Sequence, residues 1–218
     1  MQLNPGDRII NTRNELTNNY GTAGGVVKDG NGNLVMLTCF HCVFTSGMFW
    51  TDRDPNDTVS AVSFSIGNGY TSAGFVEQTQ LDDRVDMALV RPTTGHILNT
   101  NIPKVGKTNG LRFLGENDKG IVQLKKYGAT TNETTGVFDG FIPQFGAIYP
   151  GETSFHYLDK LIKIISPNGR KFADQGDSGA LVLDEKNRVA GVIVMVGGNT
   201  SYAIQAGIIE TRLNVTFI

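Results

Sequence analysis

The sequence predicts an all-β protein, and two observations support this. Short apolar stretches of strand length, some alternating with small polar residues, occur along the whole chain of 218 residues. Gly-Asn, Asn-Gly and Asp-Gly pairs stand between them, as hairpin turns require. Many short strands separated by turn signals are typical of a sandwich or a barrel.

Four segments show the strand pattern most clearly. The turn sequence "KDGNGN" leads into an apolar strand that is predicted to run from Leu34 into His41, and "AVSFSI" at 61–66 alternates as a half-buried strand does. The turn "GNGY" follows at 67–70. Another apolar run opens at Asp86, and "VAGVIVMVGG" from Val189 is predicted to be a buried strand.

Helical periodicity is weak. The best candidate is "AGIIETRLNV" at 206–215, which predicts a short C-terminal helix of about two turns. A weaker helical candidate lies at 150–161, "PGETSFHYLDKL". The least patterned interior segment is 91–110, and if the chain has two lobes we expect it to cross between them there.

Composition excludes several classes of function. Nineteen Lys and Arg against 21 Asp and Glu give a net charge of -2, so nucleic acid is not an expected partner. The most apolar stretch is too short to cross a membrane and contains three glycines. No secretory signal is visible at the start, and the only cysteines, Cys39 and Cys42, fit a reducing compartment. We therefore expect a cytoplasmic location, or a signal already removed.

Three places combine a potentially catalytic side chain with the end or start of a strand. His41 follows the apolar run from Leu34, Asp86 opens the next one, and Ser178 lies within "QGDSGAL" between two glycines. Acyl transfer by serine needs a base, a carboxylate that holds the base, and backbone donors for an oxyanion. The chain supplies these residue types in the order His, Asp, Ser.

These segments resemble those of trypsin-like (chymotrypsin-fold) serine proteases. "LTCFHC" is similar to the family's "LTAAHC", "DMALV" to "DIAL", and "GDSGA" to "GDSGG". The resemblance extends from Gly21 to about Ile209. Within the family, "GTAGGVVKDGNGNLVMLTCFHCV" and "KKYGATTNETTGVFDG" resemble a bacterial group that is related to a type of plant protease.

The resemblance implies two perpendicular six-stranded β-barrels with the active site between them, here 1–100 and 101–218. His41 would be the general base and then the general acid, and Asp86 would fix its tautomer. Ser178 would be the nucleophile, and the backbone N–H groups of Gly176 and Ser178 would form the oxyanion hole. No cofactor and no metal are implied.

Nearby residues compete for these roles. Asp82 and Asp83 lie close to Asp86, but only Asp86 directly adjoins the apolar run. Asp177 is expected to be structural: in the family its counterpart pairs with a new N-terminal amine after activation cleavage. No "IVGG"-like start is present here, so we do not expect that kind of activation.

The segment "CFHC" invites two other interpretations. A Cys-x-x-Cys pair can be a redox motif, but the βαβ context of such sites is missing. Along a strand, Cys39 and His41 would share one face and Cys42 the other, which suits a single zinc ion poorly. Both thiols are therefore expected to be buried and reduced.

The substrate pocket is predicted from the same resemblance. Counting back from Ser178 places Phe172 at the pocket floor, where an aspartate would select Lys or Arg. An aromatic residue there favours a shallow or apolar pocket, although Asp174 lies close by. The facing wall is expected at Val194 and Val196.

The favoured hypothesis is a serine endopeptidase acting on a protein or peptide substrate, with an activating partner or a fused domain as a further possibility. A second hypothesis is a catalytically silent pseudoprotease that binds a peptide in the same cleft. A third is an unrelated β-sandwich in which "GDSG" is only a turn. The third requires His41, Asp86 and Ser178 to lie far apart.

Overall fold

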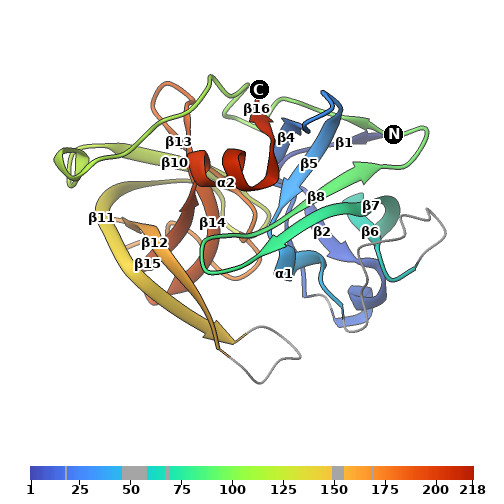
Figure 1. Ribbon diagram of the computed structural model, residues 1–218, viewed down its shortest axis with the longest axis horizontal. Coiled ribbons are helices and arrows are strands. Elements are labelled where there is room, and N and C mark those ends of the chain that lie inside the picture. The colour runs from blue at the N-terminus through green and yellow to red at the C-terminus, as the bar shows by residue number, and fades with distance from the viewer. Residues whose placement is uncertain (18, 46–57, 67–68, 149–154, 168) are drawn as a thin grey trace.

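The computed structural model describes residues 1–17, 19–45, 58–66, 69–148, 155–167 and 169–218. It is built mainly of strands, which confirms the all-β prediction. Figure 1 shows two curled sheets side by side, with one C-terminal helix across the top of the junction between them. Within the described residues, no helix is both long and apolar enough to cross a membrane.

The first sheet has the strand order β16-β4-β5-β8-β7-β6-β2-β3. β3 ends this order and β4 is the second strand from its other end, but the two are consecutive in the chain and are separated only by Ala23 and Gly24. They behave as two halves of one interrupted strand, so the sheet curls until its two sides meet. The bounds are β2 Arg8–Asn11, β3 Gly21–Thr22, β4 Gly25–Lys28, β5 Leu34–Thr38, β6 Ala61–Ile66, β7 Gly69–Leu81, β8 Asp86–Pro92 and β16 Thr216–Phe217.

The second sheet is a closed barrel with the strand order β10-β11-β12-β15-β14-β13. All of its neighbouring strands are antiparallel. Closure removes the exposed edges that would otherwise pair with other chains. The bounds are β10 Gln123–Gly128, β11 Asn132–Ile148, β12 Phe155–Ile165, β13 Leu181–Asp184, β14 Val189–Gly197 and β15 Thr200–Gln205.

Short elements complete the fold. β1 (Gln2–Leu3) pairs in parallel with β9 (Ile97–Leu98), and two 3-10 turns cover Thr12–Thr17 and Glu116–Asp118. The helix α1 (Phe40–Val43) is a single turn after β5, and α2 (Ala206–Leu213) packs on β14 and β15 of the barrel and on β7 of the first sheet. The predicted C-terminal helix is thereby confirmed.

The predicted strands from Leu34, at 61–66, and from Asp86 and Val189 are confirmed as β5, β6, β8 and β14. β5 ends at Thr38 instead of running into His41, and Ser63 of β6 is fully buried, so this strand is not half-buried as predicted. Of the turn at 67–70, Gly67 and Asn68 lie outside the described residues. The weak helix prediction at 150–161 is wrong from Phe155 onward, where the chain forms β12 between β11 and β15, and residues 150–154 lie outside the described residues. Pairing on both sides of this strand outweighs a weak local preference for helix.

The last strand of the chain returns to the first sheet. β16 pairs with β4, so Thr216 and Phe217 lie in the sheet that also contains β2 to β8. The predicted division at 1–100 and 101–218 remains a prediction. β16 belongs to the second of these parts but pairs with β4 of the first. One hydrophobic cluster includes side chains from both sheets, among them Leu37, Val90, Leu181 and Val192, so the two sheets share a core.

The backbone between β3 and β4 passes close to the loop before β13 at Gly24. A Cβ atom at this position would lie 1.9 Å from the backbone oxygen of Gly179 and 3.1 Å from that of Leu37. We expect Gly24→Ala to lower the free energy of unfolding by about 3 kcal/mol, because backbone atoms cannot move aside as a flexible side chain can. Urea unfolding measures this.

Gly115→Ala is the matched control, since the nearest atom to its Cβ would be 4.0 Å away. An equal, small effect of both substitutions would contradict the close approach of the two backbones.

Candidate active site

His41 comes from the turn that ends β5. The chain leaves β5 at Thr38 and closes one helical turn, in which Cys42 N donates to the backbone oxygen of Cys39 at 3.2 Å. The side chain of His41 is 18% exposed, whereas Asp86, the first residue of β8, is fully buried. Adjacent pairing of β5 and β8 brings these two residues together.

Two contacts join His41 to Asp86. His41 Nδ1 lies 2.6 Å from Asp86 Oδ2, and the backbone N–H of His41 donates to Asp86 Oδ1 at 3.1 Å. A carboxylate accepts hydrogen bonds, so it holds the proton on Nδ1 and leaves Nε2 with its lone pair. This arrangement suits a general base whose acting atom is Nε2.

Charge at this site shifts the pKa of two groups. Burial opposes protonation of His41, but the Cys42 sulfur and the Asp86 carboxylate outweigh it and hold the pKa of His41 well above 6.5. Burial also raises the pKa of the Cys42 thiol, but a hydrogen bond with Cys39 and the charge of His41 lower it to about 6. The site therefore stabilises an imidazolium, as proton transfer to His41 requires.

The competing acids have other partners. Asp82 Oδ1 accepts the backbone N–H groups of Arg84 and Val85, so this side chain stabilises the turn before β8. The backbone oxygen of Asp83 accepts the N–H of Asp159. It is Asp86 that contacts His41, through both of its carboxylate oxygens.

Ser178 lies in the loop before β13, where the two sheets meet. Its hydroxyl donates to the backbone oxygen of Val194 on β14 at 3.3 Å, and its own backbone oxygen accepts the N–H of Thr22 at 2.7 Å. The thiol of Cys42, next to His41, also donates to the backbone oxygen of Ser178 at 3.6 Å. Ser178 is thus adjacent to the His41 turn, which the third hypothesis of an unrelated sandwich does not allow.

Two glycines shape this loop. Gly176 has φ of 95° and Gly179 has φ of 99°, a region in which other residues are strained. A Cβ on Gly176 would lie 2.4 Å from Thr130 Oγ1, and one on Gly179 would lie 2.2 Å from the backbone oxygen of Thr22. Both the backbone angles and the packing therefore explain why glycine occurs before and after the Asp-Ser pair.

Asp177, the residue before Ser178, holds the same loop in place through buried contacts. It is fully buried and lies 3.2 Å from Lys126 Nζ, which is fully buried as well. Asp177 also accepts the N–H groups of Thr130, Thr131 and Asp174, at 2.9, 3.2 and 3.0 Å. The cation that pairs with the Asp177 carboxylate is therefore the side-chain ammonium group of Lys126.

Sequence reasoning missed Lys126 and Thr22. Lys126 lies on β10 on the inward face that also carries Leu124 and Gly128, and a lysine on the buried face of a strand is unusual enough to be a signal. It lies in "KKYGATTNETTG", a stretch that the sequence connects only with the family resemblance. Thr22 Oγ1 donates to the backbone oxygen of Gly176 at 2.8 Å, but "GTAGG" gives no sign of this.

The three predicted pocket residues differ in exposure. Phe172 has no exposed surface and Val194 is 2% exposed, whereas Val196 is half-buried. The ring of Phe172 packs in the core of the barrel with other apolar side chains, among them Leu124, Phe138 and Ile164, and its place at the pocket floor stays a prediction. Of the three, Val196 is the one whose side chain a ligand can contact.

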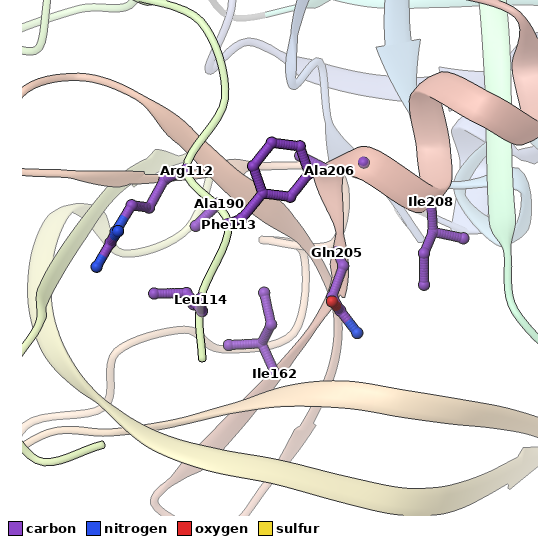
Figure 2. Close-up of a pocket in the computed structure, with 9 residues that line it drawn as sticks. Arg112, Phe113, Leu114, Ile162, Ala190, Gln205, Ala206 and Ile208 are labelled. Carbon is purple, nitrogen blue, oxygen red and sulfur yellow. The ribbon is translucent and has the colours of Figure 1, made fainter. Parts of the chain in front are cut away.

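A separate hollow of about 130 Å³ lies between the segment that leads into β10 and the start of α2. Figure 2 shows Phe113 above it, with Arg112, Leu114, Ile162 and Gln205 around it. None of its lining residues is a predicted catalytic residue. This hollow is therefore not the candidate active site.

The fold is that of bacterial proteases with the chymotrypsin-like double barrel. Solved structures that the chain resembles include a Nocardiopsis protease (19% identity, TM-score 0.68) and Protease A of Thermobifida fusca (16%, 0.68). A chymotrypsin of Cellulomonas bogoriensis is also similar (19%, 0.65). In each comparison the match covers 100% of this chain and 99% of the other. No protein-family model and no curated protein matches the chain.

Proposed function

We propose that this protein is a serine endopeptidase that hydrolyses peptide bonds of a protein or peptide substrate. The observation that carries the proposal is the pair of contacts between His41 and Asp86 beside a serine on a glycine-flanked loop. The similar solved structures named above are all proteases by name. No cofactor is needed for this chemistry.

In the first half of the reaction, Ser178 Oγ attacks the carbonyl carbon of the substrate and His41 Nε2 takes the hydroxyl proton. Asp86 stabilises the imidazolium that forms. The N–H groups of Gly176 and Ser178 would hold the oxyanion. When the intermediate collapses, His41 gives its proton to the leaving amine, and an acyl group remains on Ser178.

In the second half, a water molecule loses a proton to His41 and attacks the acyl carbon. Collapse of this second intermediate breaks the bond to Ser178 Oγ, which regains its proton from His41, and the acid product leaves. The hydroxyl must first turn from the backbone oxygen of Val194 toward His41. A 3.3 Å hydrogen bond to a neutral carbonyl is weak enough to be exchanged in this way.

A fluorophosphonate probe tests the proposal. We expect stoichiometric labelling of the folded protein at Ser178, located by peptide mapping, because the probe reacts with a serine only where a base activates it. The Ser178→Ala variant should not be labelled. Peptide binding without any labelling of a well-folded protein would support the pseudoprotease instead.

A further inference from the structure

The turn that presents His41 also gathers two thiols around it. Cys39 Sγ, Cys42 Sγ and one ring nitrogen of His41 all lie within 4.8 Å of one another. A strand from 39 to 42 would have separated the two cysteines, but α1 is helical, so the expectation that Cys42 points away is wrong. The helical turn thus assembles three ligand groups that an extended chain would have kept apart.

The donor set matches a particular class of metal ion. Two sulfurs and one imidazole nitrogen favour Zn²⁺ or a softer thiophilic ion over Mg²⁺ or Ca²⁺, which prefer oxygen ligands. A tetrahedral zinc ion with metal–ligand distances of about 2.0–2.3 Å has its ligands within about 4 Å of one another. The spacing in this turn needs only small side-chain movements to reach that geometry.

The surroundings of the three groups also favour a metal ion. Asp86 Oδ2 is 2.6 Å from His41 Nδ1, and a carboxylate on the far nitrogen is the usual support of a zinc-binding histidine. Cys39 is fully buried and Cys42 is 5% exposed, so water competes poorly for the two sulfurs, and binding must release the proton of Cys39, because burial raises the pKa of that thiol. The half-buried His41 leaves one side open for entry.

We infer that Cys39, His41 and Cys42 form a Zn²⁺ site whose occupation reversibly inhibits the enzyme. Three protein ligands leave the fourth position to water or to a group of the substrate. Binding occupies the lone pair of His41 that must accept the proton of Ser178, so the metal-bound protein has no general base. The metal site itself stands on the ligand geometry, and only the inhibition rests on the proposed function.

Zinc titration against a chromophoric chelator, with the thiols kept reduced, measures the site directly. We expect one equivalent of Zn²⁺ to bind to the wild type, and Cd²⁺ to give a thiolate-to-metal absorption band. Cys39→Ser and Cys42→Ser should each weaken Zn²⁺ binding by at least about 10-fold, since each removes a ligand. The His96→Ala variant, which changes a histidine bonded to Thr93, is the matched control and should bind as the wild type does.

Inhibition is read as the ratio of fluorophosphonate labelling rates without and with Zn²⁺, so that any change in basal reactivity cancels. This ratio should fall toward one in both cysteine variants. Binding that is unchanged by both substitutions, or labelling of the wild type that saturating Zn²⁺ does not slow, would overturn the inference. The Ser178→Ala variant should still bind Zn²⁺. Cysteine-dependent binding in a wild type that the probe never labels would therefore reject the proposed function and keep the metal site.

Discussion

Replacing Ser178 by alanine is expected to lower kcat for peptide hydrolysis by a factor of roughly 10⁴ or more while the fold remains intact. The reason is that the substitution removes the hydroxyl that would form the acyl intermediate. Ser178 is half-buried, and its hydroxyl donates to one backbone oxygen, so its removal costs little stability. Kinetics on a peptide selected by profiling the wild type measure the loss, and urea unfolding measures the fold.

Asp86→Asn should also reduce kcat by about 10⁴-fold, for a different reason. An asparagine amide cannot hold the proton on His41 Nδ1 or stabilise the imidazolium as the carboxylate does through its 2.6 Å contact. Because the three residues act as a unit, the double variant Ser178→Ala, Asp86→Asn should be hardly slower than Ser178→Ala alone.

Ser72→Ala is the matched control for these variants, because Ser72 is an exposed serine on β7. It should leave kcat unchanged. If the losses in Ser178→Ala and Asp86→Asn multiplied in the double variant, the two residues would act independently, and the proposed mechanism would be wrong.

Much of the fold could be predicted because local signals and packing agree. The segment with Val62 and Phe64 forms a strand, and the Asn31-Gly32 pair lies in the turn before β5. The return of the chain end as β16 could not be predicted, since Thr216 and Phe217 form a pairing partner for β4 only once the first sheet has curled.

The candidate site was predictable where a residue type that can act in catalysis stands at the end or start of a predicted strand. His41, Asp86 and Ser178 each stand at the end or start of an apolar run, and the structure brings His41 and Asp86 into contact. The environment of these residues was not predictable. The helical turn from Phe40 spans only four residues, too few for a periodic signal, and Phe172 is a core residue.

Lys126→Met is expected to lower the free energy of unfolding by about 3–5 kcal/mol, because it leaves the buried carboxylate of Asp177 without its cation. The loop that carries Gly176 and Ser178 should also lose its position, so labelling by the fluorophosphonate probe should slow. Urea unfolding and the labelling rate measure the two effects. The exposed pair of Lys171 and Asp174 provides the control, since Lys171→Met should cost less than about 1 kcal/mol.

The double variant Lys126→Met, Asp177→Asn distinguishes the effect of an unpaired buried charge from the effect of the lost hydrogen bonds. Removing both charges should recover part of the stability lost in Lys126→Met, because no unpaired ion is left in the core. Labelling should stay slow, since an asparagine side chain in place of Asp177 could not accept the hydrogen bonds of Thr130, Thr131 and Asp174 in the same way. Equal stability of the single and double variants would contradict the ion pair.

The pH dependence gives this pair a distinct signature. Burial lowers the pKa of Lys126 below its ordinary 10.5, and Asp177 offsets only part of the shift. Between the folded and the unfolded pKa the unfolded chain binds more protons, so the titration of Lys126 alone raises the free energy of unfolding as pH increases. The labelling rate should instead fall as the pH rises, with a midpoint below pH 10.5, because a neutral amine no longer holds Asp177. Lys126→Arg should move this decline to higher pH, since a guanidinium keeps its charge. A decline at the same pH in Lys126→Met would show that another group causes it, and Lys126 would then have no part in holding the catalytic loop.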